Sequence, residues 1–120
     1  MTASTAEALE GRPVIVYVMN WDLPPQKANL EVYTNKARND WIPFTLNHSG
    51  VTSLRSYRNI LETTPQVAVV IEFEHLDSWK EYIGSKNYMR LMRELRILGC
   101  QHISTRVWSL WEMGGSPPLR

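Results

Sequence analysis

Three histidines are the side chains best suited to move a proton near neutral pH: His48, His75 and His102. His75 follows an apolar run and precedes a helical pattern, which places it at the rim between a sheet and its helices. An imidazole there can act as a general base toward an acidic C–H or a phenol, or it can simply bond to a turn carbonyl or to solvent. His102, which begins the last apolar run, has the same two interpretations. His48 is expected in a turn.

Asn20 is the second candidate for a catalytic role, because it follows the first apolar run. Its amide can orient a substrate carbonyl, or it can form a turn. Our catalytic hypothesis pairs the two residues, with His75 as the base and Asn20 as the orienting group.

Aromatic residues are frequent, with five tryptophans and five tyrosines in 120 residues. Aromatic walls with a few polar tips suit flat organic ligands, although the same side chains can fill a core or a dimer interface. We therefore predict a small apolar or aromatic ligand. The candidate ligand-binding residues are Tyr33, Trp41, Tyr57, Trp79, Tyr82, Tyr88 and His102.

Composition argues against several other classes of protein. No histidine pair has metal-ligand spacing and no cysteine or carboxylate cluster joins the histidines, so no metal site is predicted. Thirteen basic and twelve acidic residues give a net charge of +1 with no basic block, which argues against nucleic acid as a partner. A single cysteine, Cys100, fits a reducing compartment. The start of the chain lacks signal-peptide features and no apolar run could span a membrane, so we expect a cytoplasmic protein without a membrane partner.

The pattern of elements predicts one domain over residues 13–112, with a flexible leader at 1–12 and a flexible tail at 113–120. Strands are expected over about 14–19, 51–60, 67–74 and 102–111, and helices over about 26–46 and 77–98, the second broken at Gly84-Ser85. This order is βαββαβ, an α+β fold.

Local signals refine the two helical regions. Pro43 predicts a kink or an early stop in the first, whose buried face is expected to carry Leu30, Tyr33, Ala37, Trp41 and Phe44. In the second, Ser78 and Glu81 match a capping box, and Gly99 stands where a helix C-terminal glycine belongs.

The predicted sheet has two apolar faces and helices for only one of them. In the third strand, Val67, Val69 and Ile71 share one face, while Ala68 and Val70 lie on the other. A large exposed apolar face is unusual on a monomer, so we expect two copies to pair through their sheets into a homodimer.

Two segments resemble the dimeric α/β-barrel superfamily, and most of all its antibiotic-biosynthesis monooxygenase type. The first runs from Val69 through Trp79 to Tyr88, and the second from Asp40-Trp41-Ile42-Pro43-Phe44 through Ser49-Gly50-Val51 to Arg58. The resemblance implies a ferredoxin-like four-stranded antiparallel sheet that dimerises into an α/β barrel. It also implies a cofactor-independent monooxygenase that acts on an aromatic or polyketide-like substrate, with no bound cofactor.

Two departures from the family pattern keep other functions open. Trp41 stands where many members carry the histidine of a His-x-Pro motif, and Lys86-Asn87-Tyr88 occupies the region where heme-degrading relatives carry a ligand histidine. A cyclase or isomerase of the same superfamily, or a non-catalytic dimer that binds a hydrophobic metabolite, therefore remain alternatives to the monooxygenase.

Overall fold

The computed structural model describes residues 15–111, so the predicted leader and tail lie outside the described residues. Four strands and two helical regions follow the predicted βαββαβ order. In chain order the elements are β1 (Ile15–Asp22), α2 (Lys27–Lys36), η1 (Ala37–Trp41), α3 (Ile42–Leu46), β2 (Val51–Arg58), β3 (Val67–Phe73), α4 (Leu76–Ile83), α5 (Lys86–Ile97) and β4 (Gln101–Ser109).

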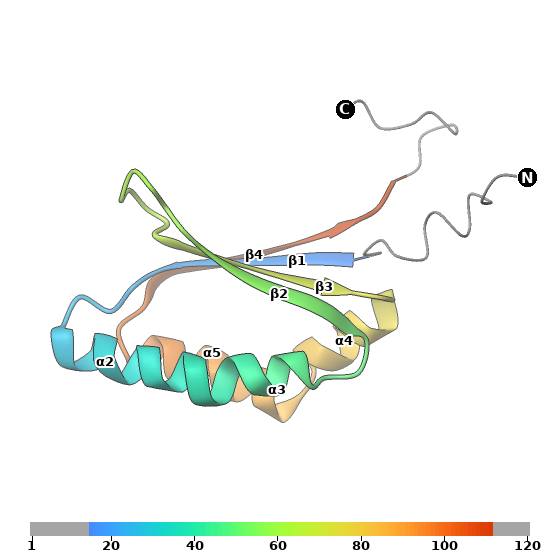
Figure 1. Ribbon diagram of the computed structural model, residues 1–120, viewed down its shortest axis with the longest axis horizontal. Helices are drawn as coiled ribbons and strands as arrows, with labels where there is room; N and C mark the ends of the chain where they lie inside the picture. Colours follow the sequence, from blue (N-terminus) through green and yellow to red (C-terminus); the bar gives the residue numbers. More distant parts are fainter. Residues whose placement is uncertain (1–14, 112–120) are drawn as a thin grey trace, which may run out of the picture.

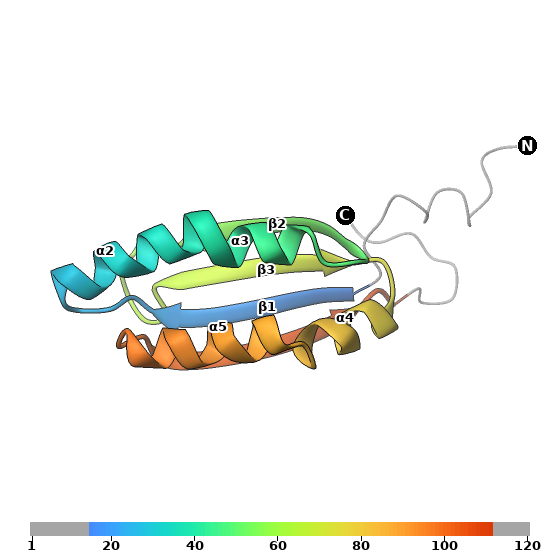
Figure 2. The ribbon, with the colours of Figure 1, turned by 90° about the horizontal axis from the view of Figure 1, so that it is seen from below.

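The strands form one antiparallel sheet in the order β2-β3-β1-β4. All helices lie on one face of it (Figure 1). Seen from the helix side, α2 to α3 run along the β2 edge, and α4 and α5 run along the β4 edge (Figure 2). The predicted α+β fold with a ferredoxin-like arrangement is confirmed.

Strict alternation along β1 separates the two faces of the sheet. Ile15, Tyr17, Met19 and Trp21 are buried against the helices, while the residues between them are half-buried on the other face. Because this alternation continues to Asp22, β1 is longer than the predicted strand, and Asn20 lies inside a strand instead of a turn.

Of the two outcomes expected at Pro43, a kink or an early stop, the stop does not occur, because the helical region continues to Leu46. The chain instead forms a π-helical turn just before Pro43, where the Ile42 N–H donates to the Ala37 carbonyl five residues earlier. A wider turn of this kind accommodates a proline that cannot donate to the carbonyl four residues back. Beyond this turn Thr45 is fully buried, at 2 % exposure, and Phe44 is half-buried against the core, as Tyr33 and Ala37 are.

The expected capping box in the second helical region is wrong, whereas the expected terminal glycine is confirmed. Helix α4 begins at Leu76, so Ser78 lies within it and is buried. The side-chain cap belongs to α5, where Ser85 accepts a hydrogen bond from the Tyr88 N–H at 3.1 Å. Gly99 has φ +96° and closes α5 with a hydrogen bond from its N–H to the Arg96 carbonyl.

No helix of the described residues covers the other face of the sheet, which we call the open face. Its centre is aliphatic, with Val16 and Val18 of β1 beside Val70 and Ala68 of β3. Trp108 of β4 pairs with Val16 and is 57 % exposed. The predicted second apolar face is therefore present, although Arg55 and Arg106 lie on either side of its centre.

Candidate ligand-binding cavity

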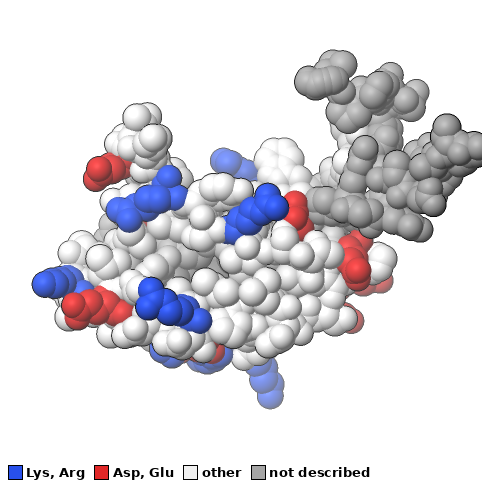
Figure 3. All heavy atoms as spheres, in the orientation of Figure 1, with Lys and Arg blue, Asp and Glu red and all other residues white. Residues whose placement is uncertain are grey.

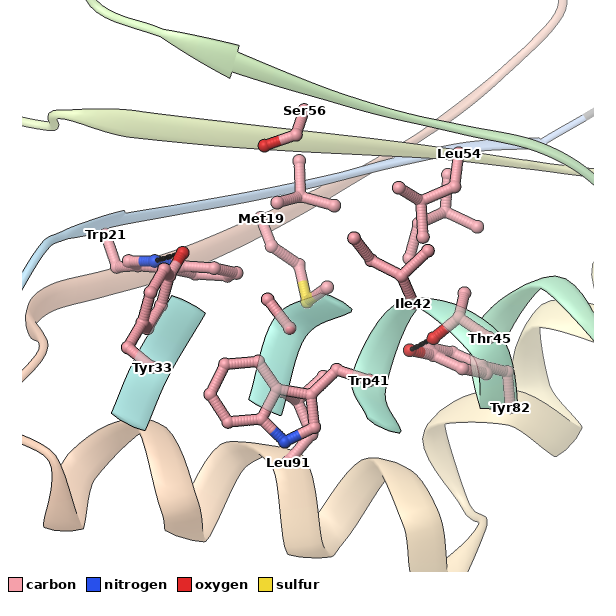
Figure 4. A pocket seen from close by; sticks show the side chains of 13 residues that line it. Met19, Trp21, Tyr33, Trp41, Ile42, Thr45, Leu54, Ser56, Tyr82 and Leu91 are labelled. Atoms are coloured by element: carbon pink, nitrogen blue, oxygen red, sulfur yellow. Dashed lines mark hydrogen bonds between the residues drawn. The ribbon is translucent and has the colours of Figure 1, made fainter. Parts of the chain in front are cut away.

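A cavity lies between the helix-facing side of the sheet and the first helical region (Figure 4). Every strand except β4 contributes to its walls, together with α2, η1, α3 and one residue each from α4 and α5. The lining residues are Met19, Trp21, Tyr33, Ala37, Trp41, Ile42, Thr45, Leu54, Ser56, Val69, Ile71, Tyr82 and Leu91.

Aromatic rings with satisfied polar atoms form one wall of this cavity. The Trp21 Nε1–H donates to the Tyr33 hydroxyl oxygen at 2.9 Å, and the Tyr33 ring meets the Trp41 ring edge-on at 5.4 Å. Burial raises the pKa of Tyr33 to about 12, so the phenol keeps its proton near neutral pH. In the bond with Trp21 the Tyr33 hydroxyl acts as the acceptor, which leaves its O–H proton available to donate to a ligand.

A second hydroxyl pair closes the other end of the cavity. Thr45 and Tyr82 are joined through their hydroxyl oxygens at 2.8 Å, and both side chains are almost fully buried. Burial raises the pKa of Tyr82 to about 12, which keeps this phenol neutral as well. The cavity is thus apolar with hydroxyl tips, and no lining residue carries a charge or an imidazole.

Trp41 links the cavity to a group of charged residues behind it. Its Nε1–H donates to Glu94 Oε1 of α5 at 2.9 Å. Lys36 contacts the other oxygen of Glu94 at 3.0 Å, and Arg90 makes a two-point contact with Asp40 at 2.5 and 3.0 Å. The first helical region and α5 are therefore joined by two acids and two bases.

The cavity is small but opens toward a larger groove. Its volume is about 50 Å³, which is room for a few waters. The adjoining groove between β2 and α2 offers about 390 Å³ by the same measure and shares Tyr33 and Ser56 with the cavity. Arg58 borders the groove. Figure 3 shows this side of the molecule, where the hollow between the sheet and the helices is uncharged and Lys or Arg side chains lie around it.

Of the predicted ligand-binding residues, Tyr33, Trp41 and Tyr82 line the cavity. Tyr57 borders the groove and is 51 % exposed. Trp79 and Tyr88 instead meet around Tyr17 of β1: the Tyr17 and Tyr88 hydroxyls are 2.5 Å apart, and the Trp79 ring lies edge-on to Tyr17 at 5.8 Å. The structure therefore divides the predicted aromatic set between two neighbouring clusters.

The structure does not bring the proposed catalytic pair together. His75 is exposed at the residue preceding α4, whereas Asn20 lies on the open face between Ala68 and Ser104. Because Ile15 pairs with Phe73 and Asn20 with Ala68, roughly 16 Å of strand separates their positions. The two side chains of one subunit cannot act on the same substrate atom.

His102 is held by a carboxylate at the other end of the sheet from His75. Its Nδ1 lies 2.6 Å from Asp22 Oδ2, and its ring is 67 % exposed. Asp22 also accepts from the Thr64 hydroxyl at 2.8 and 2.9 Å and from the Gln66 N–H at 3.0 Å. Burial acts to raise the pKa of Asp22, but the hydrogen bonds lower it by a larger amount. The net pKa therefore lies below the ordinary value.

Replacing Asp22 with Asn is expected to destabilise the fold by about 1–3 kcal/mol at pH 7, because several hydrogen bonds to a charged acceptor are weakened. A depressed carboxyl pKa stabilises the native state above the unfolded pKa, near 4, and that contribution is lost as the pH falls through the native value. Urea unfolding at pH 7 and below pH 3 should therefore show a gap between wild type and variant that closes in acid. Glu62→Gln, which neutralises an exposed acid in the nearby loop, is the control. A gap that is constant with pH would contradict the assignment.

Several lining residues were not predicted from the sequence. Thr45 follows Ala37 and Trp41 at steps of four, a spacing that could have indicated it. Ser56 lies two residues after Leu54 in β2 and so faces the same side of the sheet, but a lone serine in a strand does not indicate a cavity. Glu94 lies far from Trp41 in the sequence, and only the packing of α5 on the first helical region brings the two together.

Two features are absent from the described residues. Within residues 15–111, no helix has the length and apolar character needed to cross a membrane. The same part of the chain contains no group of three or more histidine, cysteine or acidic side chains placed to hold a metal ion.

The geometry defines a class of protein: a ferredoxin-like α+β domain with an aromatic cavity under its sheet and, within residues 15–111, no helix over the opposite face. No protein-family model and no curated protein sequence matches the chain. Solved structures do match it over most of its length, each at low sequence identity, and they establish the fold.

Three of these structures illustrate the likeness. A candidate antibiotic biosynthesis monooxygenase from Deinococcus radiodurans has a TM-score of 0.65 at 8% identity, covering 82% of this chain and 94% of that one. A dimeric protein of unknown function with a ferredoxin-like fold from Bacteroides fragilis has a TM-score of 0.65 at 14% identity, covering 81% and 96%. A dabb family protein with a ferredoxin-like fold from Mesorhizobium loti has a TM-score of 0.66 at 14% identity, covering 83% and 99%.

Proposed function

We propose that this protein binds a small, largely apolar organic molecule in the cavity and its adjoining groove. The supporting observation is the chemistry of the lining, which is aliphatic and aromatic, carries several hydroxyl groups and contains no charge. Such a site favours a neutral ring system, because burying a charge there without a partner would be costly.

An oxygen function on the ligand would find donors in the cavity. The Tyr33 O–H is free to donate while its oxygen accepts from Trp21, and Ser56 lines both the cavity and the groove. The enclosed part is much smaller than the roughly 300–1,000 Å³ of sites for drug-sized ligands. A ligand would therefore place one ring or a short apolar end inside and the remainder in the groove, where Arg58 can meet a polar group.

We further propose that the protein acts as a homodimer, with the open faces of two copies packed together. The aliphatic centre formed by Val16, Val18, Ala68 and Val70 supports this, as does exposed Trp108 beside it. A dimeric protein of the same fold is among the structural neighbours.

The enzymatic form of the proposal is a cofactor-independent monooxygenase, and the likeness to a candidate monooxygenase favours it. An activated ring methylene that has lost a proton can react with O₂ to give a carbonyl and one molecule of water, so that both oxygen atoms are accounted for. Neutral phenols such as Tyr33 would stabilise the developing enolate oxygen by donating to it. Because no base lines the cavity, the substrate must be acidic enough to lose its proton without one, or water must accept that proton. Oxygen uptake that matches product one to one would separate this reaction from cyclisation or isomerisation, and a ligand recovered unchanged would indicate binding alone.

Leu54→Trp tests the location of the site. A larger side chain at this lining position should fill the cavity and weaken the binding of a neutral fluorescent probe, N-phenyl-1-naphthylamine, at least about tenfold, which corresponds to ~1.4 kcal/mol. Leu61→Trp makes the same change at a loop position that is 76 % exposed and should leave binding unchanged. Circular dichroism would confirm that both variants are folded at the titration temperature. Equal probe affinity for Leu54→Trp and wild type would place the ligand elsewhere.

A further inference from the structure

The structure suggests how the shape of the cavity is maintained. We propose that Glu94 is a positioning residue of the ligand site: its carboxylate fixes the Trp41 indole as a wall of the cavity and so determines how tightly a ligand is held. This inference rests on the proposed ligand site and adds to it a residue that does not line the cavity.

Trp41 lies at an irregular place in the helix, and its indole has a defined side-chain partner. It lies at the end of the π-helical turn η1, next to Pro43, where the regular helical hydrogen-bond pattern is interrupted. Its ring lines the cavity and is 4 % exposed, and its Nε1–H points away from the ligand space to Glu94 Oε1 at 2.9 Å. A buried indole N–H that loses its acceptor is unfavourable, so the ring would turn to find another.

Glu94 is itself held on more than one side. Lys36 lies 3.0 Å from its Oε2, and Arg90 lies 3.3 Å from its Oε1. Arg90 also contacts Asp40, which in turn lies 3.7 Å from Lys36. With two acids and two bases the group is electrically balanced, so the carboxylate is positioned before any ligand arrives.

The protonation state agrees with this role. Partial burial acts to raise the pKa of Glu94. The hydrogen bond from Trp41 and the nearby Lys36 and Arg90 lower it by a larger amount. The net pKa lies below the ordinary value, and the acceptor of the indole bond stays ionised near neutral pH.

A purely structural role for Glu94 makes a different prediction. If the residue only tied α5 to the first helical region, its removal would act like the loss of Lys36, the other member of that ion pair. Positioning through the indole instead requires that the effect depend on the Trp41 N–H.

The experiment compares Glu94→Leu, Glu94→Gln and the control Lys36→Met in the full chain. One readout is the indole ¹H–¹⁵N resonance of Trp41, assigned by its loss in Trp41→Phe, together with its rate of exchange with water. The other is the affinity for N-phenyl-1-naphthylamine. Glu94→Leu should shift the resonance, speed its exchange at least about tenfold and weaken the probe about five- to tenfold. Glu94→Gln, which keeps an oxygen acceptor, should restore most of both. In Lys36→Met the Glu94 carboxylate still has Arg90 and the Trp41 N–H as partners, so the affinity should change less than about twofold.

A double-mutant cycle with Trp41→Phe keeps the proposal testable if Glu94→Leu also lowers stability. Once the N–H is absent, adding Glu94→Leu should weaken the probe no further. An equal loss in both backgrounds, or an unshifted indole resonance in Glu94→Leu, would overturn the positioning role. If wild type bound no probe, the proposed ligand site would fail, whereas the indole resonance would still report whether Glu94 holds Trp41.

Discussion

Val18→Asp is expected to convert a dimer into monomers. Val18 lies at the centre of the open face, paired with Val70 of β3 on one side and Arg106 of β4 on the other. In a two-fold symmetric pair each substitution places two carboxylates in the interface, one from each copy. Removing each charge from water costs several kcal/mol, and Arg106 would offset only part of that cost. The dissociation constant should therefore rise by about a thousandfold or more, since ~4 kcal/mol corresponds to that factor.

Sedimentation velocity over a dilution series would measure this change. Val32→Asp makes the same substitution on α2, at a side chain that is 44 % exposed on the helix side, and it should leave the assembly intact. Far-UV circular dichroism should be alike for the three proteins. A wild type that sediments as a single subunit at every micromolar concentration would remove the dimer from the proposal, and so would a Val18→Asp protein that remains paired.

The two faces of the sheet were predictable because strand side chains alternate with a period of two. That period correctly divided Val67, Val69 and Ile71 from Ala68 and Val70. The same rule, continued past Met19, would have buried Trp21 and turned Asn20 to the open face. The sequence instead places Asn20 after the strand, either to orient a substrate or to form a turn, because its residue type is common at both. The cross-strand pairing that continues to Asp22 outweighed that local preference.

The first helical region shows where sequence periodicity is insufficient. A spacing of three or four residues gives Tyr33, Ala37 and Trp41 correctly, but it assumes a regular helix on both sides of Pro43. A π-helical turn lies just before Pro43, and beyond it Thr45 is fully buried whereas Phe44 is half-buried against the core. Nothing in the residue types of 37–41 specifies that turn; it is the way in which this chain continues a helix through a proline.

The aromatic inventory identified a class of ligand better than it identified contacts. Whether a ring lines the cavity depends on the direction in which it leaves its helix and on what it then packs against. Tyr82 reaches the cavity from α4, whereas Trp79 of the same helix lies against Tyr17. Such a division is a property of tertiary packing, and so is the contact between Trp41 and Glu94, which are 53 positions apart in the chain.

Gly50→Ala is expected to be the most destabilising single methyl addition to the described chain. Gly50 has φ +88°, a left-handed conformation that costs a non-glycine residue about 1–2 kcal/mol. An added Cβ would also lie 2.0 Å from Ser78 Oγ and 2.4 Å from Ser78 Cβ. Ser78 is buried in α4, and the Gly50 carbonyl accepts from the Glu74 N–H at 2.8 Å, so neither side can move freely. We expect a total loss of about 3–5 kcal/mol, at the upper end of point-mutant effects.

Gly99→Ala separates the backbone contribution from the steric one, because Gly99 has a similar φ of +96° but the nearest atom to an added Cβ is Pro25 Cδ at 3.6 Å. This control should lose only the conformational part, about 1–2 kcal/mol, in urea unfolding monitored by tryptophan fluorescence. Gly50→Ala combined with Ser78→Gly removes both clashing atoms and should recover part of the difference, less ~1 kcal/mol for a glycine within α4. Equal losses for Gly50→Ala and Gly99→Ala would mean that the turn before β2 can withdraw from α4. In that case the close packing of this turn against the helix that carries Tyr82 would not fix that end of the cavity.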